Sequence, residues 1–336
     1  MTSSTSSSEM VPASDQSALP SGKAQREAAG RLLMRILLPL SAVFILFCLG
    51  LDRFVRVRLI GENSTHGASK LFRIQAPRPL EIPILGSSRA LCAFIPDTLG
   101  KDYYNYGING IGYAVMDIFM KHELAQHGKR GPIILNFDFT MFYYQLGDRS
   151  TYLPHAGMPE VKDLLKRHDE YSPYMIIPGI RFFGSIDAIG KEYLNQRIEL
   201  TKSTNKGAAI ERTVTSPSYF AALEKRRLDT MEPWRPRKEL IDTLFKRIGD
   251  HPEREFFVVV SPYHPSYLHA IPSADLASVK QLFRRLDALP NARVIDFDTH
   301  DWPDECFSNT SHVSMIGARR VSQMLRDSLK VSPVPQ

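Results

Sequence analysis

Cysteine is scarce in this chain of 336 residues, which contains three of them: Cys48, Cys92 and Cys306. So few cysteines exclude a disulfide-rich scaffold, and their spacing matches no metal-binding motif. The sequence also lacks a glycine-rich nucleotide loop, a cluster of metal-ligating residues and an internal repeat. We therefore expect neither a cofactor nor a metal ion.

A concentrated run of positive charge is missing as well. The formal net charge is +6 at pH 7, but the lysines and arginines are scattered and form no basic tract with interleaved aromatic residues. This distribution argues against nucleic acid as a partner. It is compatible with a surface near anionic lipid or with an acidic polymer.

The N-terminal region changes character near residue 31. Residues 1–30 are rich in Ser, Ala, Gly and charge, which predicts a disordered segment. The positive charges that flank the following apolar run slightly favour a cytoplasmic N-terminus, so we expect a disordered cytoplasmic tail. Residues 31–52 contain an apolar run of about 20 residues, roughly enough to cross a bilayer. No small-x-small site follows the run, which favours an uncleaved transmembrane anchor over a signal peptide. The large Phe47 before Cys48 disfavours a lipoprotein.

The rest of the chain predicts an α/β fold, with one N-terminal transmembrane helix before it. Residues 53–78 are polar and turn-rich, which suggests a stalk or a peripheral strap. Short apolar runs at 82–85, 133–137, 256–260 and 293–297 then alternate with helical patterns at 113–127, 237–248, 274–289 and 314–330. This alternation over 79–331 predicts a doubly wound, flavodoxin-like parallel sheet. Residues 145–235 are too long for a loop and predict a helical insertion that could cap a site.

Two polar segments at opposite ends of this domain suggest chemistry. An apolar strand ends in Gly86-Ser87-Ser88-Arg89, and His312 lies near the C-terminus. A strand-to-helix turn can present a serine hydroxyl, and a distant histidine can return as its base. The pair predicts acyl chemistry with Ser88 as the nucleophile and His312 as the general base. The alternative is that the two serines only cap a helix.

Several motifs in a fixed order resemble the SGNH (GDSL-like) hydrolase superfamily, in the membrane-anchored branch that includes polysaccharide O-acetyltransferases and teichoic-acid D-alanyl transfer proteins. The matching segments are 85–89, 104–110, 134–138, 261–265 and 309–312, followed by Gly317. The resemblance implies that Ser88 carries the acyl group. It also implies oxyanion donors from the Ser88 N–H, from Gly107 or Gly110, or from the side chains of Asn109 or Asn136.

One position departs from the family pattern, because Asn309 stands where the family has an aspartate. An amide can orient an imidazole but supplies no negative charge to the imidazolium. Asp301 or Asp304 could instead fold back to His312 Nδ1. The pattern is also compatible with a Ser-His dyad completed by a backbone carbonyl, or with a site that has lost its chemistry.

Three further expectations concern residues near the two ends of this site. Arg89 is expected to form a salt bridge, for example with Asp138, rather than to act in catalysis. His264 is expected in a loop, where it could contact substrate. Cys92 and Cys306 lie close in sequence to the site, and they form either a disulfide bridge or two separate buried thiols.

The resemblance implies a membrane-anchored acyltransferase that moves an acyl group, expected to be acetyl, onto hydroxyls of an extracytoplasmic polysaccharide. It further implies a membrane-bound acyltransferase as partner and a catalytic domain on the periplasmic side of the cytoplasmic (inner) membrane. An esterase of the same fold would use the same serine and histidine. A non-catalytic polysaccharide-assembly protein is a third hypothesis, because of Asn309.

Overall fold

The computed structural model describes residues 22–77, 80–127, 131–143, 145–200, 206, 208 and 234–330. The chain divides into two compact units, residues 1–49 and residues 50–336. Helix α1 (Gly22–Phe54) accounts for the described part of the first unit. Within the described residues, the segment 30–60 is the one helix long and apolar enough to cross a membrane. Its apolar side chains Leu38, Val43 and Leu46 are mostly exposed, as expected for a lipid-facing surface.

A parallel sheet of five strands organises the second unit, and the strand order is β2-β1-β3-β4-β5. The strands are β1 (Ile82–Leu85), β2 (Tyr103–Asn105), β3 (Ile133–Phe137), β4 (Phe256–Val260) and β5 (Ala292–Asp296). The α/β prediction with a doubly wound parallel sheet is confirmed. Four strands lie within one residue of their predicted bounds, whereas β2 is too short and too polar to show in the sequence.

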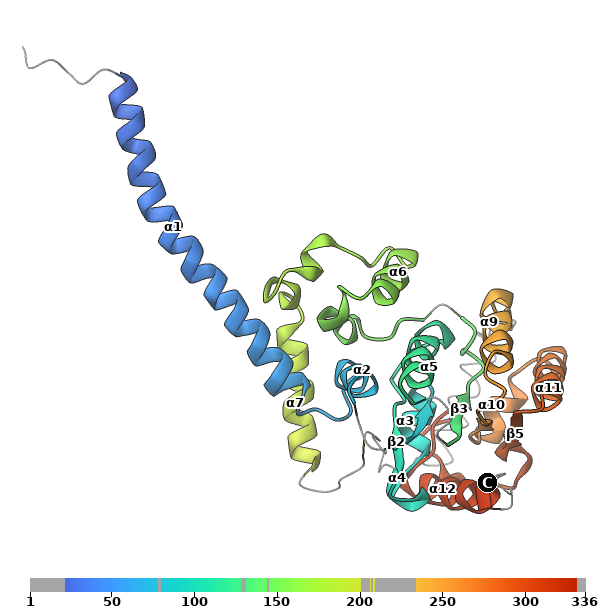
Figure 1. Cartoon of the computed structure of the whole chain (residues 1–336). Helices are drawn as coiled ribbons and strands as arrows, with labels where there is room; N and C mark the ends of the chain where they lie inside the picture. The colour runs from blue at the N-terminus through green and yellow to red at the C-terminus, as the bar shows by residue number, and fades with distance from the viewer. Residues whose placement is uncertain are drawn as a thin grey trace, which may run out of the picture. The chain divides into compact units, whose positions relative to one another are not determined.

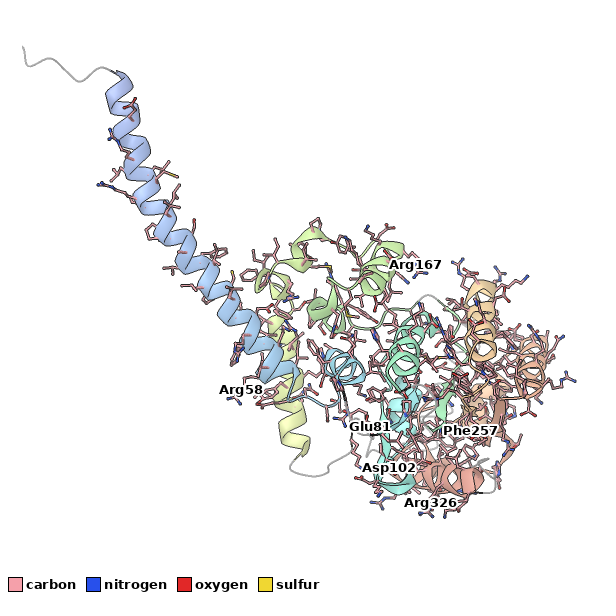
Figure 2. The ribbon with its side chains drawn as sticks, in the orientation of Figure 1. Arg58, Glu81, Asp102, Arg167, Phe257 and Arg326 are labelled. Atoms are coloured by element: carbon pink, nitrogen blue, oxygen red, sulfur yellow. The ribbon has the colours of Figure 1, made fainter. Side chains whose placement is uncertain are left out.

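Helices cover both faces of this sheet, because alternate strand residues enter two different cores (Figure 1). Val258 of β4 lies in the core beneath α5 (Tyr113–His127), α9 (Lys238–Gly249) and α11 (Ser273–Asp287). Val259 lies in the core beneath α3 (Ser88–Ala93), α4 (Pro96–Leu99) and α12 (Met315–Lys330). Figure 2 shows the buried Phe257 of β4 in this body and Arg167 at its exposed surface.

The segment that follows α1 packs against the second unit, so of the two alternatives for 53–78 it is not a stalk. A π-helical turn (Val55–Ile60) leads to α2 (Gly67–Gln75), whose Leu71 and Ile74 are at most 1% exposed in the main core. Lys70 of the same helix is fully buried. The polar composition concealed a short helix with one apolar face, which covers α5.

The described part of the predicted insertion consists of short helices packed near α2 and α5, and of a longer helix, α7 (Ile186–Leu200), packed on the π-helical turn at 55–60. The short helices are 3₁₀ turns at 149–151, 153–155, 173–176 and 180–182, with α6 (Pro159–Arg167). The remainder of the predicted insertion, residues 201–205, 207 and 209–233, lies outside the described residues. Three more short elements follow the sheet strands: α10 (Pro265–His269) and 3₁₀ turns at 297–299 and 304–306.

Candidate active site

The polar motifs found in the sequence gather at the carboxyl edge of the sheet. Ser88 follows β1, Asn109 follows β2, Asp138 follows β3, His264 follows β4 and His312 follows β5. Strand β1 pairs with β2 on one side and with β3 on the other, so the direction of winding reverses at β1. In sheets of this type, ligands bind outside the carboxyl ends of the strands at such a reversal. The topology therefore places Ser88 at the preferred position for a site.

The turn from β1 into α3 presents Ser88. A Cβ atom at Gly86 would lie 2.6 Å from the Ala90 Cβ, so a glycine is needed for this close turn. The Ser87 hydroxyl accepts a hydrogen bond from the Arg89 N–H (3.3 Å) and donates one to Asp138 Oδ2 (2.7 Å). Ser88 is thus the first residue of the helix and is half-buried. Its N–H has no partner within the helix, so it remains available as a donor.

The structure brings Ser88 and His312 together although 224 positions separate them: His312 Nε2 lies 2.8 Å from Ser88 Oγ. The imidazole is half-buried, so it can be reached from solvent. A hydrogen bond of this length allows the ring to take the hydroxyl proton as the oxygen attacks a carbonyl.

Asn309 fixes the imidazole of His312 from the other side. Asn309 Oδ1 lies 3.1 Å from His312 Nδ1 and accepts the backbone N–H groups of Ser311 and His312, each at 2.9 Å. Two N–H donors require that this atom be the oxygen of the amide. Because it can only accept, the proton of the neutral ring lies on Nδ1. Nε2 is then left as a base toward Ser88.

The position beside His312 Nδ1 is taken by Asn309, and not by the two aspartates considered as replacements. Asp304 Oδ1 lies 3.1 Å from His264 Nε2, and Asp301 is exposed. His264 is 7% exposed and caps α10, with its Nδ1 accepting from the Ser266 N–H (3.2 Å). The pair His264–Asp304 therefore joins two loops of the site. This arrangement gives His264 a structural role.

Arg89 is buried and forms no salt bridge with Asp138, contrary to expectation. Its guanidinium donates to the carbonyl oxygens of Ser261 and Ser311 and lies over the Tyr263 ring. One side chain thus joins the start of α3, the end of β4 and the loop that carries His312. A buried cation held by carbonyl dipoles and an aromatic face fixes these three segments relative to one another.

Two of the expected oxyanion donors are occupied elsewhere. The Gly107 N–H donates to Asn105 Oδ1 (2.8 Å), and Asn136 Nδ2 donates to Val259 O (3.0 Å). Gly110 is exposed in a turn with φ of 70°. The donors that remain are the Ser88 N–H, the Gly110 N–H and the exposed Asn109, whose neighbour Ile108 donates to Gly86 O (3.0 Å).

Gly107 shows why the loop after β2 lies so close to α3. A Cβ atom at this position would lie 2.5 Å from the Leu91 N and 2.9 Å from Asn105 Oδ1. Backbone at this distance tolerates only glycine. The loop that carries Asn109 is therefore held against the first turn of α3.

Lys70 is a site residue that the sequence did not reveal. Its Nζ lies 2.5 Å from Gly107 O, so α2 supports the loop after β2 from below the surface. Burial lowers the pKa of Lys70 from 10.5 to about 7. Lysine in a polar segment before the first strand carries no signal of such a role, which depends on how α2 packs.

Asp298 and two cysteines also lie near these segments. Asp298 Oδ1 accepts the Tyr263 N–H (2.6 Å), and burial raises the pKa of Asp298 to about 7. Cys92 and Cys306 are free buried thiols, so the disulfide alternative is not realised.

Comparison with known proteins adds little to this geometry. No protein-family model and no curated protein matches the chain. Among solved structures, a candidate platelet activating factor from Streptococcus pneumonia is 14% identical, covers 82% of this chain and 97% of its own, and has a TM-score of 0.38. A carbohydrate esterase, whose active site is described as having divergent catalytic and non-catalytic binding functions, is 8% identical. It covers 77% of this chain and 67% of its own, with a TM-score of 0.34.

Proposed function

We propose that this chain is a serine-dependent acyltransferase that moves an acyl group onto hydroxyls of a polysaccharide outside the cytoplasm. The proposal is carried by one observation, the relay from Asn309 Oδ1 through the His312 ring to Ser88 Oγ, with distances of 3.1 and 2.8 Å. The order of the motifs, which resembles the SGNH superfamily, supports the same chemistry.

Acylation begins when Ser88 Oγ attacks the carbonyl carbon of the acyl donor. His312 Nε2 takes the hydroxyl proton as the new C–O bond forms. The Ser88 N–H and Asn109 are the donors assigned to the oxyanion. The bond from the carbonyl carbon to the donor oxygen then breaks, the leaving oxygen takes the proton from His312, and the acyl group remains on Ser88.

Deacylation reverses these proton transfers with a different alcohol. A sugar hydroxyl gives its proton to His312 Nε2 as its oxygen attacks the acyl carbon. The bond to Ser88 Oγ breaks, and the serine takes the proton back. The free enzyme and an acylated sugar are the products. If water enters in place of the sugar, the same steps make an esterase.

The location of the reaction is part of the proposal. Helix α1 is long and apolar enough to anchor the chain in a membrane, and the balance of flanking positive charges slightly favours a cytoplasmic N-terminus. We place the chain in the cytoplasmic (inner) membrane with the second unit on the periplasmic side. A membrane-bound acyltransferase that carries acyl groups across the bilayer is the proposed donor partner.

A serine-directed fluorophosphonate probe tests the nucleophile on the full chain in detergent. Wild-type protein should be labelled, and Ser88→Ala should lose the label. Ser278→Ala, a change of an exposed serine on α11, is the matched control and should label like wild type. Absence of label on wild type, or persistence of label in Ser88→Ala, would overturn the proposal.

Product analysis separates transfer from hydrolysis. The full chain is supplied with an activated acetyl ester, with and without a mixture of oligosaccharides, and the products are identified by mass spectrometry. Acetylated sugar that depends on Ser88 supports the transferase. Acetate alone, released at the same rate whether or not sugar is present, would support the esterase instead.

A further inference from the structure

A pocket of about 250 Å³ shares one wall with α3 and with the loop after β2, the two segments that carry Ser88 and Asn109. Leu91, one helical turn after Ser88 in α3, and Asn109 of the loop after β2 form the wall next to the site. Thr65, Asp148, Ser150 and Glu192 are among the residues that line the rest of the pocket. Glu192 comes from α7, so the described part of the insertion contributes to this pocket.

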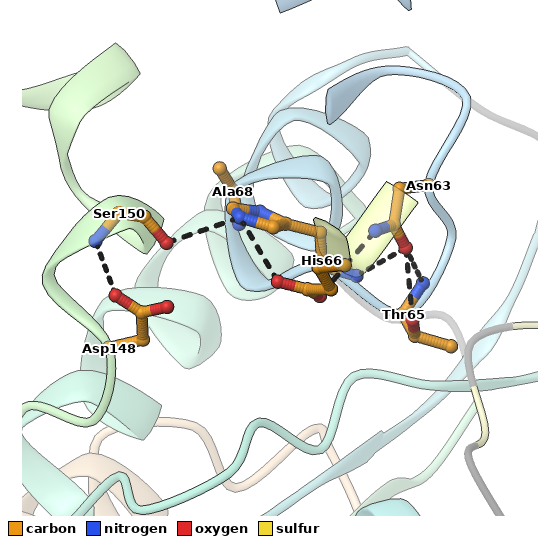
Figure 3. A network of polar contacts seen from close by, with 7 residues as sticks. Asn63, Thr65, His66, Ala68, Asp148 and Ser150 are labelled. Atoms are coloured by element: carbon orange, nitrogen blue, oxygen red, sulfur yellow. Dashed lines mark hydrogen bonds and ion pairs between the residues drawn. The ribbon is translucent and has the colours of Figure 1, made fainter. Parts of the chain in front are cut away.

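The lining residues carry no positive charge near neutral pH. His66 is their one basic side chain; its Nδ1 accepts from the Ala68 N–H (3.1 Å) and its Nε2 lies 3.2 Å from Ser150 Oγ (Figure 3). It is 1% exposed, and burial lowers its pKa to about 4, so it is neutral at pH 7. Asp148 and Glu192 therefore make the lining negative, which disfavours anions such as phosphate or carboxylate groups, and the buried Lys70 behind the wall offsets part of this charge.

The same two carboxyl groups suit a neutral hydrogen-bond donor. Burial and the neighbouring Asp148 raise the pKa of Glu192 to about 7, so near pH 7 its carboxyl is ionised only in part. A carboxyl group in either state accepts a hydrogen bond from a hydroxyl. With Leu91 and Ile108 as an apolar surface, the walls match a ring that has hydroxyls at its rim and C–H groups on its face.

We propose that this pocket binds one neutral sugar ring of the acyl acceptor, with Glu192 and Asn109 as its hydrogen-bonding residues. The volume is below the ~300–1,000 Å³ of pockets for larger ligands, which suits a single ring. Leu91 is one helical turn from Ser88 and Asn109 is an assigned oxyanion donor, so the proposal has a ring held here direct a hydroxyl to the acyl carbon on Ser88. The role as acceptor subsite rests on the proposed function, whereas affinity for hexosides does not.

Saturation-transfer NMR on the full chain in lipid nanodiscs tests the pocket. The probes are the methyl glycosides of glucose, galactose, mannose and N-acetylglucosamine, at up to about 10 mM, where a site with Kd near 1 mM is almost saturated. At least one glycoside should bind, and Glu192→Ala should weaken binding at least about tenfold, because the ring loses its carboxyl acceptor. Glu192→Gln keeps the size and an acceptor and should give a smaller loss.

The matched control is Asp187→Ala, which removes an exposed acid from the same helix and should bind like wild type. Ser88→Ala should also bind normally. Three outcomes would overturn the pocket assignment. They are failure of every glycoside to bind, equal binding by Glu192→Ala and wild type, and binding of the small cation ethylammonium but of no glycoside. Persistent fluorophosphonate labelling in Ser88→Ala would remove the acyltransferase while leaving glycoside binding intact, so the two failures are distinguishable.

Discussion

At the scale of single residues, the unusual feature is the uncharged partner of the histidine. Asn309 keeps the geometry that an aspartate would give, because its Oδ1 is fixed by two backbone N–H groups and holds His312 Nδ1. What it lacks is the charge that stabilises the imidazolium formed during proton transfer. Position and tautomer are therefore preserved, and the electrostatic contribution is lost.

Changing Asn309→Asp should restore that charge. We expect kcat to rise about tenfold and the acid limb of the pH–rate profile to move about one unit toward higher pH, since a carboxylate favours the protonated ring. Hydrolysis of an activated acetyl ester from pH 5 to 9 measures both quantities.

Asn309→Ala serves as the comparison for this change. It removes the acceptor at His312 Nδ1 and should lower kcat about 10- to 100-fold. Equal rates and unshifted pH profiles in both variants would show that Asn309 does not act on His312.

The sequence predicted some of these residue roles and missed others for identifiable reasons. Ser88 and His312 each follow a strand or precede a helix with a strong apolar pattern, so their place at the sheet edge could be inferred. The partner of His312 could not, because a tight turn at Asn309 decides which side chain reaches Nδ1. The carbonyl contacts of Arg89 were also hidden, since backbone acceptors leave no mark in a sequence.

At the scale of elements, α2 connects the region after α1 to the site. Its Lys70 supports Gly107 O from within the core, and its neighbours Leu71 and Ile74 pack in the same core. Sequence patterns located the long helices around the sheet, and α9, α11 and α12 each show a repeating apolar face. A helix of nine residues with one buried lysine has too short a pattern to be recognised.

The buried lysine predicts a pH dependence of stability. Between its folded pKa of about 7 and its ordinary value of 10.5, the unfolded chain binds the proton and the folded chain does not. The free energy of unfolding should therefore rise from pH 7 to pH 9, by on the order of 2 kcal/mol. Urea unfolding of the full chain in detergent at the two pH values measures this change.

Lys70→Met isolates the contribution of this group, since methionine fills a similar volume without a titrating amine. The rise between pH 7 and pH 9 should be smaller in the variant by the amount that Lys70 contributes. The same rise in both proteins would contradict the assignment of this shift to Lys70.

At the scale of the whole molecule, the body that carries the candidate site extends further toward the N-terminus than the sequence suggested. The second unit begins at Gly50, not at residue 79. Ala68, Leu71 and Ile74 of the added segment are at most 1% exposed. The sheet and its layers followed from the alternation of strands and helices, but this boundary depended on contacts between segments that are distant in the sequence.

Truncation tests the boundary directly. A fragment of residues 50–336 should be soluble and unfold cooperatively, whereas residues 79–336 should not. Each large apolar side chain lost from a core costs about 2–5 kcal/mol, and total stability is about 5–15 kcal/mol. Urea unfolding followed by circular dichroism compares the two fragments. A cooperative transition of equal midpoint in the shorter fragment would contradict the extended boundary.

The neutral amide at position 309 has a consequence for timing. Under the proposed function, the imidazole has no counter-ion, so it would activate a water molecule poorly and the acyl group on Ser88 would be hydrolysed slowly. An alcohol that is already docked escapes much of this handicap, because its oxygen is held in place while it waits for the proton to leave. Slow hydrolysis would then favour transfer over loss of the acyl group to water, because the acyl-Ser88 intermediate would persist until an acceptor alcohol binds.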